Sequence, residues 1–255
     1  LLKIGADLIS VETGHAHNTF TIAFIRKLKK QFKTIQISAA LVVDAGGAEA
    51  LIKSGADNIR VGIGGGSHCT TRLVTGVGRP QLSAVADCFK ITQKYNIPLL
   101  SDTGIRYAGD VLKAIIFGAD AVMIGGLFTG TDECPGKIVV KEGKKYKYSW
   151  GMSTNMASEH KMLDLFTPTA IVKNSIKQMR SFIANSSRGE PKNFEEGTGG
   201  LMPYKGSVTI ILNEFIQAIR RSMWYQGATT FTDLRNKARV VLVSSNTMAE
   251  NVPRI

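Results

Sequence analysis

One short phrase, Gly-Ala-Asp followed by an apolar run, occurs three times in this chain, beginning at Gly5, Gly55 and Gly118. In each copy the glycine follows a helical pattern, and β-branched apolar residues come after the aspartate. Glycine suits the left-handed conformation that often ends a helix, and a short continuous apolar run is typical of a buried parallel strand. The repeat therefore predicts helices and strands that alternate along a parallel α/β sheet.

The segments between the repeats continue this alternation. We expect two more strands, over residues 35–43 and 97–101, and helices near 19–32, 45–54, 80–95 and 107–117. A Gly-rich or polar segment follows each strand, as at the chemical edge of a (β/α)₈ barrel. We predict an α/β fold of the (β/α)₈ TIM-barrel type that is incomplete, with about five C-terminal βα units instead of eight.

The regular alternation of strands and helices ends after Gly136. Residues 137–148 are expected to form a hairpin, residues 153–195 a mobile flap, and residues 207–223 an amphipathic helix. Residues 235–243 are expected to add a last strand or a tail contact. We therefore divide the chain into a partial barrel with a cysteine loop (1–136), a hairpin and flap (137–206), and a C-terminal helix and tail that complete the barrel (207–255).

Charge and composition narrow the choice of partners. The net charge is +12, and residues 137–194 hold eleven Lys and Arg against four Asp and Glu. No interleaved aromatic residues or known module accompany this excess, so we expect a solvated basic segment rather than nucleic-acid binding. No apolar run is long enough to span a membrane. The three cysteines are far apart and form no CxxC pair, which fits a reducing cytoplasm.

The stretch Val61–Arg79, VGIGGGSHCTTRLVTGVGR, is the most informative. Its glycines let the backbone approach a ligand closely. Cys69 follows a predicted strand and lies near Arg72, where a thiol can act as a nucleophile. Cys88 on a helix and Cys134 in a loop are interpreted as inert.

Other strand ends indicate a nucleotide site. Asp102 can accept both hydroxyls of a ribose, and Ser67, Gly104, Gly125 and the following Gly126 can hold a phosphate through their loops. A second group, Glu12 with His15 and His17, leaves a metal site open as an alternative to a polar lining of the site mouth.

Several phrases, in order, carry a resemblance to a known family: GGGSHCTTR, TGVGRPQLSAV, SDTGIRYAGDVLKA, GADAVMIGGLFTGTDECPG, WGMST and EEGTGGLMPYKG. They resemble the IMP dehydrogenase/GMP reductase family over nearly the whole chain. The resemblance implies a (β/α)₈ barrel, usually a homotetramer, that binds a purine nucleotide and a nicotinamide cofactor. The family's first strands have no counterpart in this chain.

The resemblance also implies residue roles. Cys69 matches the nucleophile that attacks purine carbon 2, and Thr71 and Glu196 match a pair that acts on water or ammonia. Ser67, Gly104 and Gly125 match phosphate contacts, and Asp102 matches the ribose contact. Gly151, Met152 and Glu196 match residues that contact the purine. Glu12, Thr13 and Gly14 match the cofactor site. The backbone carbonyls of Gly64, Gly66 and Cys69 match the ligands of a potassium ion.

The family contains two activities, a reduction of GMP and an oxidation of IMP. We expect reduction of GMP to IMP with NADPH, because Gly126, the segment 80–85 and Gly151-Met152-Ser153-Thr154 resemble the reductases. Oxidation of IMP to XMP with NAD is the alternative, favoured by the long flap and by Gly199-Gly200. Departures from both patterns at Leu41, Gly65, His68 and Thr103 leave open a third reading, an inactive truncated nucleotide-binding paralogue.

Overall fold

The structure is a computed structural model that describes residues 1, 4–154, 157, 195–245 and 247. Its centre is a five-stranded parallel sheet whose strands follow one another in chain order. These strands are β1 (Leu8–Val11), β2 (Gln36–Val42), β3 (Asn58–Val61), β4 (Leu99–Asp102) and β5 (Ala121–Met123). Each repeat of the Gly-Ala-Asp phrase leads directly into a strand. The predicted parallel α/β fold, consistent with an incomplete TIM barrel, is confirmed.

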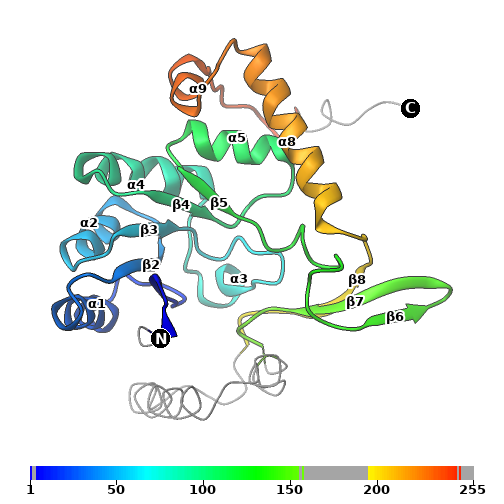
Figure 1. The fold of residues 1–255 in the computed structure, drawn as a ribbon, viewed down its shortest axis with the longest axis horizontal. Coiled ribbons are helices and arrows are strands. Elements are labelled where there is room, and N and C mark those ends of the chain that lie inside the picture. Colours follow the sequence, from blue (N-terminus) through cyan, green and yellow to red (C-terminus); the bar gives the residue numbers. More distant parts are fainter. Residues whose placement is uncertain (2–3, 155–156, 158–194, 246, 248–255) are drawn as a thin grey trace.

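Four helices connect the strands and pack side by side as one layer (Figure 1). They are α1 (Thr19–Gln31), α2 (Ala45–Lys53), α4 (Gln81–Tyr95) and α5 (Ala108–Ile116). Asn18 and Asp44 cap α1 and α2 by accepting hydrogen bonds from the backbone N–H groups of Thr21 and Gly47. Such caps satisfy donors that the first turn of a helix leaves free. Because all five strands are parallel, their C-termini point to one edge of the sheet.

The apolar core lies between this helix layer and the middle strands. Ile37, Leu51, Ile59 and Leu99 are fully buried there. The outer strands are different, because Leu8 in β1 is 44% exposed and Met123 in β5 is 38% exposed. Strands in the middle of a sheet are covered on both sides, whereas these two edges are only partly covered. The gradient of burial agrees with an open sheet rather than a closed barrel.

A small antiparallel sheet stands beside the larger one. It contains β6 (Ile138–Lys141), β7 (Lys144–Trp150) and β8 (Gly199–Pro203), in that order. Glu142 and Gly143 join β6 to β7 with φ angles of 51° and 73°, the positive values of a tight hairpin turn. The hairpin is therefore confirmed. Most of the predicted flap, residues 153–195, lies outside the described residues.

The C-terminal part packs on α5. α8 (Val208–Tyr225) and α9 (Phe231–Lys237) form a second apolar cluster with it, which includes Val111, Ile115 and Leu234. The expectation of a last strand over 235–243 is wrong: Thr230 caps α9, and no strand follows among the described residues. Arg235 instead donates from this helix to the carbonyl oxygens of Ile115 and Ala119, at 2.9 and 3.0 Å.

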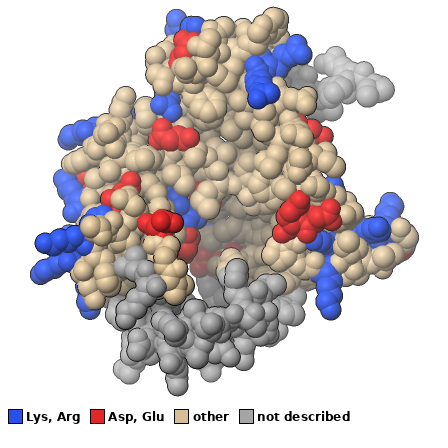
Figure 2. All heavy atoms as spheres, in the orientation of Figure 1, with Lys and Arg blue, Asp and Glu red and all other residues tan. Residues whose placement is uncertain are grey.

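The face drawn in Figure 2 carries its Lys and Arg side chains at separate places around the rim rather than in one continuous patch. None of the described helices is both long and apolar enough to cross a membrane.

Candidate active site

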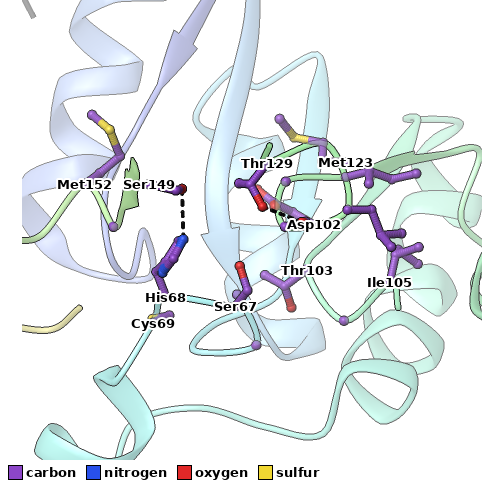
Figure 3. A pocket seen from close by; sticks show the side chains of 18 of the residues that line it. Ser67, His68, Cys69, Asp102, Thr103, Ile105, Met123, Thr129, Ser149 and Met152 are labelled. Carbon is purple, nitrogen blue, oxygen red and sulfur yellow. Dashed lines mark hydrogen bonds between the residues drawn. The ribbon is translucent and has the colours of Figure 1, made fainter. Parts of the chain in front are cut away.

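A cavity of about 760 Å³ opens at the C-terminal edge of the parallel strands (Figure 3). Its walls come from the segments that follow β3, β4 and β5, from the end of β7, and from Glu196. These segments are far apart in sequence, and the parallel topology brings their ends together. The edge that the sequence marks with polar and Gly-rich residues is thus the edge that holds the pocket.

Most of the predicted site residues line this pocket. They are Gly66, Ser67, Cys69, Asp102, Gly104, Gly125, Gly126, Gly151, Met152 and Glu196. Thr71, at the start of α3 (Thr71–Thr75), lies behind the wall and contacts Cys69 and Glu196. Gly64 and the predicted cofactor residues Glu12, Thr13 and Gly14 do not line the pocket.

Three predicted catalytic residues form one chain of hydrogen bonds. The Cys69 Sγ–H donates to Thr71 Oγ1 at 3.1 Å. The Thr71 hydroxyl then donates to Glu196 Oε2 at 2.6 Å. A thiol whose proton has a path to a carboxylate can become a nucleophile without releasing that proton to bulk water. The arrangement therefore suits covalent attack by sulfur on an electrophilic carbon in the pocket.

Backbone hydrogen bonds also join the cysteine loop to the segment around Glu196. Thr70 N–H donates to the carbonyl oxygen of Glu196 at 2.9 Å, and Thr198 N–H donates to that of His68 at 2.8 Å. Cys69 and Gly197 form an antiparallel bridge between these bonds. The cysteine loop and the segment before β8 therefore form one unit, although about half the chain separates them in sequence.

The environment of Cys88 separates it from Cys69. Cys88 is fully buried, and its thiol donates to the carbonyl oxygen of Asp44 at 3.3 Å. Burial, followed by the charges of Asp44 and Asp87, raises the pKa of the Cys88 thiol to about 12. Cys88 therefore stays protonated at neutral pH, in agreement with the inert role expected for it.

The predicted phosphate loops meet at a close contact. A Cβ atom added to Gly126 would lie 2.5 Å from the Ser67 hydroxyl oxygen, whereas one added to Gly125 would meet no atom within 4 Å. Any side chain at 126 thus displaces Ser67, while the space beside Gly125 is open. Glycine at 126 is the residue that lets Ser67 and the loop after β5 approach each other.

The predicted ribose residue, Asp102, is held by a residue that the sequence analysis missed. Arg60 on β3 is 8% exposed and donates to Asp102 Oδ2 from Nε at 3.1 Å and from a terminal nitrogen at 2.5 Å. The same guanidinium donates to Ser10 and pairs with Glu12. Burial by itself lowers the pKa of Arg60, but the hydrogen bonds and charges of Asp102 and Glu12 outweigh it and raise that pKa. The signal was a lone Arg within a buried apolar strand.

The predicted cofactor residues lie along the loop after β1. Glu12 reaches the pocket wall only indirectly, through Arg60 and Asp102. Thr13 Oγ1 accepts from His15 N–H at 3.0 Å, so it stabilises the loop. A Cβ added to Gly14 would meet no atom within 4 Å. The roles of these residues toward a cofactor stay a prediction.

The sequence analysis raises two metal sites, one at Glu12, His15 and His17 and one for potassium in the cysteine loop, and the side-chain geometry of the described residues supports neither. His15 and His17 lie edge to face with ring centres 6.2 Å apart. The described part of the chain contains no group of three or more His, Cys, Asp or Glu side chains arranged to hold a metal. In the cysteine loop, the Gly66 carbonyl accepts from Cys69 N–H at 3.1 Å, and Arg72 donates to the carbonyl of Ile63 at 2.7 Å. The potassium site stays a prediction, and no chemistry below depends on it.

Two departures from the family pattern prove to be neighbours. Thr103 has a φ of 102°, which is rare for a β-branched residue. A Cβ added to Gly65 would lie 2.2 Å from the Thr103 hydroxyl oxygen. Gly65 therefore makes the space that Thr103 occupies, and the two changes belong together.

The whole chain matches one protein family. The sequence profile described as "IMP dehydrogenase / GMP reductase domain" matches residues 1–254. Inosine-5′-monophosphate dehydrogenases of Methanocaldococcus jannaschii and Thermoplasma acidophilum are 38% and 39% identical to it, over 99% and 98% of this chain. The chain spans about half the length of these curated relatives, 49% and 47%.

A solved structure gives a related result. A GMP reductase from Trypanosoma brucei, in complex with guanosine 5′-monophosphate, superposes with a TM-score of 0.82 and 33% sequence identity. The match covers 99% of this chain and 48% of that one. The named sequence relatives are thus dehydrogenases, and the named structure is a reductase.

Proposed function

The chain belongs to the IMP dehydrogenase/GMP reductase family, and we propose that it provides the catalytic half of a purine nucleotide oxidoreductase that reduces GMP to IMP with NADPH. The observation that carries this proposal is the hydrogen-bonded chain from Cys69 through Thr71 to Glu196 at the pocket wall. Cys69 is the only cysteine among the described residues that lines the cavity.

Cys69 acts as the nucleophile. Its proton passes through the Thr71 hydroxyl to Glu196, and the sulfur forms a bond to purine carbon 2. Glu196 returns a proton to the 2-amino group, which leaves as ammonia, and the base remains attached to Cys69 as a thioimidate. A nicotinamide cofactor, when bound, supplies the hydride to carbon 2. The carbon–sulfur bond then breaks, and IMP and the Cys69 thiolate are released.

The rest of the pocket orients the nucleotide for this attack. Asp102, held in place by the guanidinium of Arg60, accepts hydrogen bonds from the ribose hydroxyls. Ser67 and the backbone of Gly104, Gly125 and Gly126 bind the 5′-phosphate. Gly151 and Met152 contact the base. These contacts hold carbon 2 against sulfur, and such positioning contributes a large part of the rate of a two-reactant step.

The choice of reductase rests on Gly126. In the dehydrogenases this position is usually Ser, and a side chain here would displace Ser67, because the Cβ would lie 2.5 Å from its hydroxyl oxygen. A pocket built around glycine at 126 therefore fits the reductase pattern. NADPH is accordingly the proposed cofactor, near Glu12, Thr13 and Gly14.

Oxidation of IMP is the second candidate, because the curated relatives named above are dehydrogenases. The same Cys69 adduct then forms after hydride leaves carbon 2 for NAD, and water cleaves it to give XMP. Thr71 and Glu196 would take the proton from that water. Several expectations from the sequence remain predictions: a cytoplasmic homotetramer, a potassium ion, and no nucleic-acid or membrane partner.

The decisive experiment offers both reactions to the purified chain. Absorbance at the wavelength of the reduced nicotinamide should fall with GMP and NADPH and stay constant with IMP and NAD. A rise with IMP and NAD alone would assign the dehydrogenase instead. Binding of GMP and IMP without turnover in either direction would support the inactive nucleotide-binding paralogue.

A further inference from the structure

One wall of the pocket carries a polar pair to which the proposed chemistry gives no role. His68 Nε2 lies 2.9 Å from Ser149 Oγ, and both side chains line the cavity. His68 comes from the cysteine loop and Ser149 from β7, 81 residues apart in sequence. Figure 3 shows the ring between Cys69 and Ser149, with Met152 beyond them.

The position of this ring is constrained from several sides. The His68 carbonyl accepts from Thr198 N–H at 2.8 Å, which fixes its backbone to the segment before β8. A Cβ added to Gly151 would lie 3.3 Å from the Cβ of His68, so the residue that follows β7 lies close against the side chain. Ser149 then holds the tip of the ring. A side chain that is ordered before its ligand arrives loses little entropy on binding it.

The pair leaves hydrogen-bonding capacity for a ligand. Among the residues that the structure describes, Ser149 is the hydrogen-bond partner of the His68 ring, and it engages one nitrogen. The second nitrogen is a donor or an acceptor according to the tautomer that Ser149 selects. Cys69 is the next residue, at about 3.8 Å between Cα atoms, and in the proposed function its sulfur meets carbon 2 of the purine. The same base is therefore within reach of His68.

We propose that His68, oriented by Ser149, hydrogen-bonds the purine base of the bound nucleotide and is a specificity residue of this site. The inference rests on the proposed function for the identity of the ligand. A 6-oxopurine presents ring nitrogens and a carbonyl oxygen at its edges, which an imidazole can pair and an apolar side chain cannot. The small apolar residue usual in the family at this position would supply no such bond.

The test compares a ligand that has the base with one that lacks it. IMP and ribose 5-phosphate are titrated against the unaltered chain and against His68→Phe, His68→Gln and Ser149→Ala. Phenylalanine keeps the ring shape without the nitrogens, and glutamine keeps two polar atoms at its end, one for Ser149 and one for the base. Lys90→Ala, on the exposed face of α4, is the matched control.

We expect His68→Phe to weaken IMP binding by roughly 3- to 10-fold, the range for one hydrogen bond, and to leave ribose 5-phosphate unchanged. Glutamine should recover part of the loss, and Ser149→Ala should lose less than phenylalanine. Unchanged IMP affinity in a folded His68→Phe chain would overturn the inference and leave the proposed function standing. Equal losses of affinity for IMP and for ribose 5-phosphate would overturn the inference too, because they would place His68 at the ribose phosphate rather than at the base. If the unaltered chain binds no purine nucleotide, the proposed function fails with it.

Discussion

Thr71 and Glu196 are 125 residues apart in sequence and are joined by a hydrogen bond of 2.6 Å. The bond connects the first turn after the cysteine loop to the segment that leads into β8. Because the thiol of Cys69 donates to the same threonine, the carboxylate is one hydroxyl group away from the proposed nucleophile. In the proposed function, this relay is what allows Cys69 to react covalently with the bound nucleotide.

Replacing Glu196 by Gln should keep the shape of the relay and remove its proton acceptor. We expect kcat to fall by roughly 10²- to 10⁴-fold, the usual contribution of a general acid or base, and the Kd for GMP to rise by much less, through the predicted contact of Glu196 with the base. Thr71→Val should act in the same direction by breaking both bonds. Steady-state kinetics and GMP titration of the same preparations measure the two quantities. A Glu196→Gln chain with unaltered kcat would rule out this role.

Gly65 and Thr103 should behave as a coupled pair. Gly65→Ala places a methyl group against the Thr103 hydroxyl, so it should destabilise the chain by about 1–3 kcal/mol, the usual cost of overpacking. Thr103→Gly removes the obstacle and the positive-φ strain, so Gly65→Ala should be nearly neutral in that background. Urea denaturation of the four chains gives the coupling energy. Simple additivity would show that the contact does not matter.

Arg60 should determine how much the ribose hydroxyls contribute to nucleotide affinity. Arg60→Lys keeps the charge but loses the guanidinium fork that fixes Asp102. The unaltered chain should bind GMP more tightly than 2′,3′-dideoxy-GMP, and the lysine variant should show a smaller ratio of the two Kd values. Removing the charge, as in Arg60→Met, leaves the partly buried carboxylate of Asp102 without its partner and should destabilise the fold by about 1–3 kcal/mol. An unchanged ratio in Arg60→Lys would separate Arg60 from ribose recognition.

His15 should make stability depend on pH. Burial, followed by the charge of His17, lowers the pKa of His15, and its Nε2 has no hydrogen-bond partner among the described residues. The unfolded chain takes up this proton near pH 6.5, about its ordinary value, and the folded chain takes it up only at lower pH. The stabilisation is therefore complete above about pH 6.5 and declines as pH falls through the lowered pKa.

The measurement is the free energy of unfolding at pH 7.5 and pH 5.5. His15→Gln should reduce the difference between the two values, and His17→Gln should reduce it partly, because it removes the second cause. A difference that is the same in all three chains would assign the pH dependence to other groups.

The alternation of strands and helices could be predicted because it depends on local signals. The Gly-Ala-Asp repeat marks where helices end, and the apolar runs after it are too short for helices. α9 was missed although its start carries a local signal, the cap from Thr230, and the apolar run that begins at Val240 forms no strand among the described residues.

The pairing of Arg60 with Asp102 could not be predicted in this way. It depends on the register of β3 against β4, in which Arg60 lies beside Leu100 and therefore two residues before Asp102. The contacts of His68 with Ser149 and of Gly65 with Thr103 likewise join segments whose approach is decided by tertiary structure. Most of the proposed site residues could be named from their motifs, but their partners could not.

Intact-mass spectrometry tests the proposed covalent bond between Cys69 and purine carbon 2 most directly. The chain is incubated with GMP in the absence of NADPH, denatured with acid, and weighed beside Cys69→Ala and Cys134→Ala. We predict a mass increase equal to GMP minus ammonia in the unaltered chain and in Cys134→Ala, with none in Cys69→Ala, although all three bind GMP. An adduct that persists in Cys69→Ala, or bound GMP that never forms one, would contradict the mechanism.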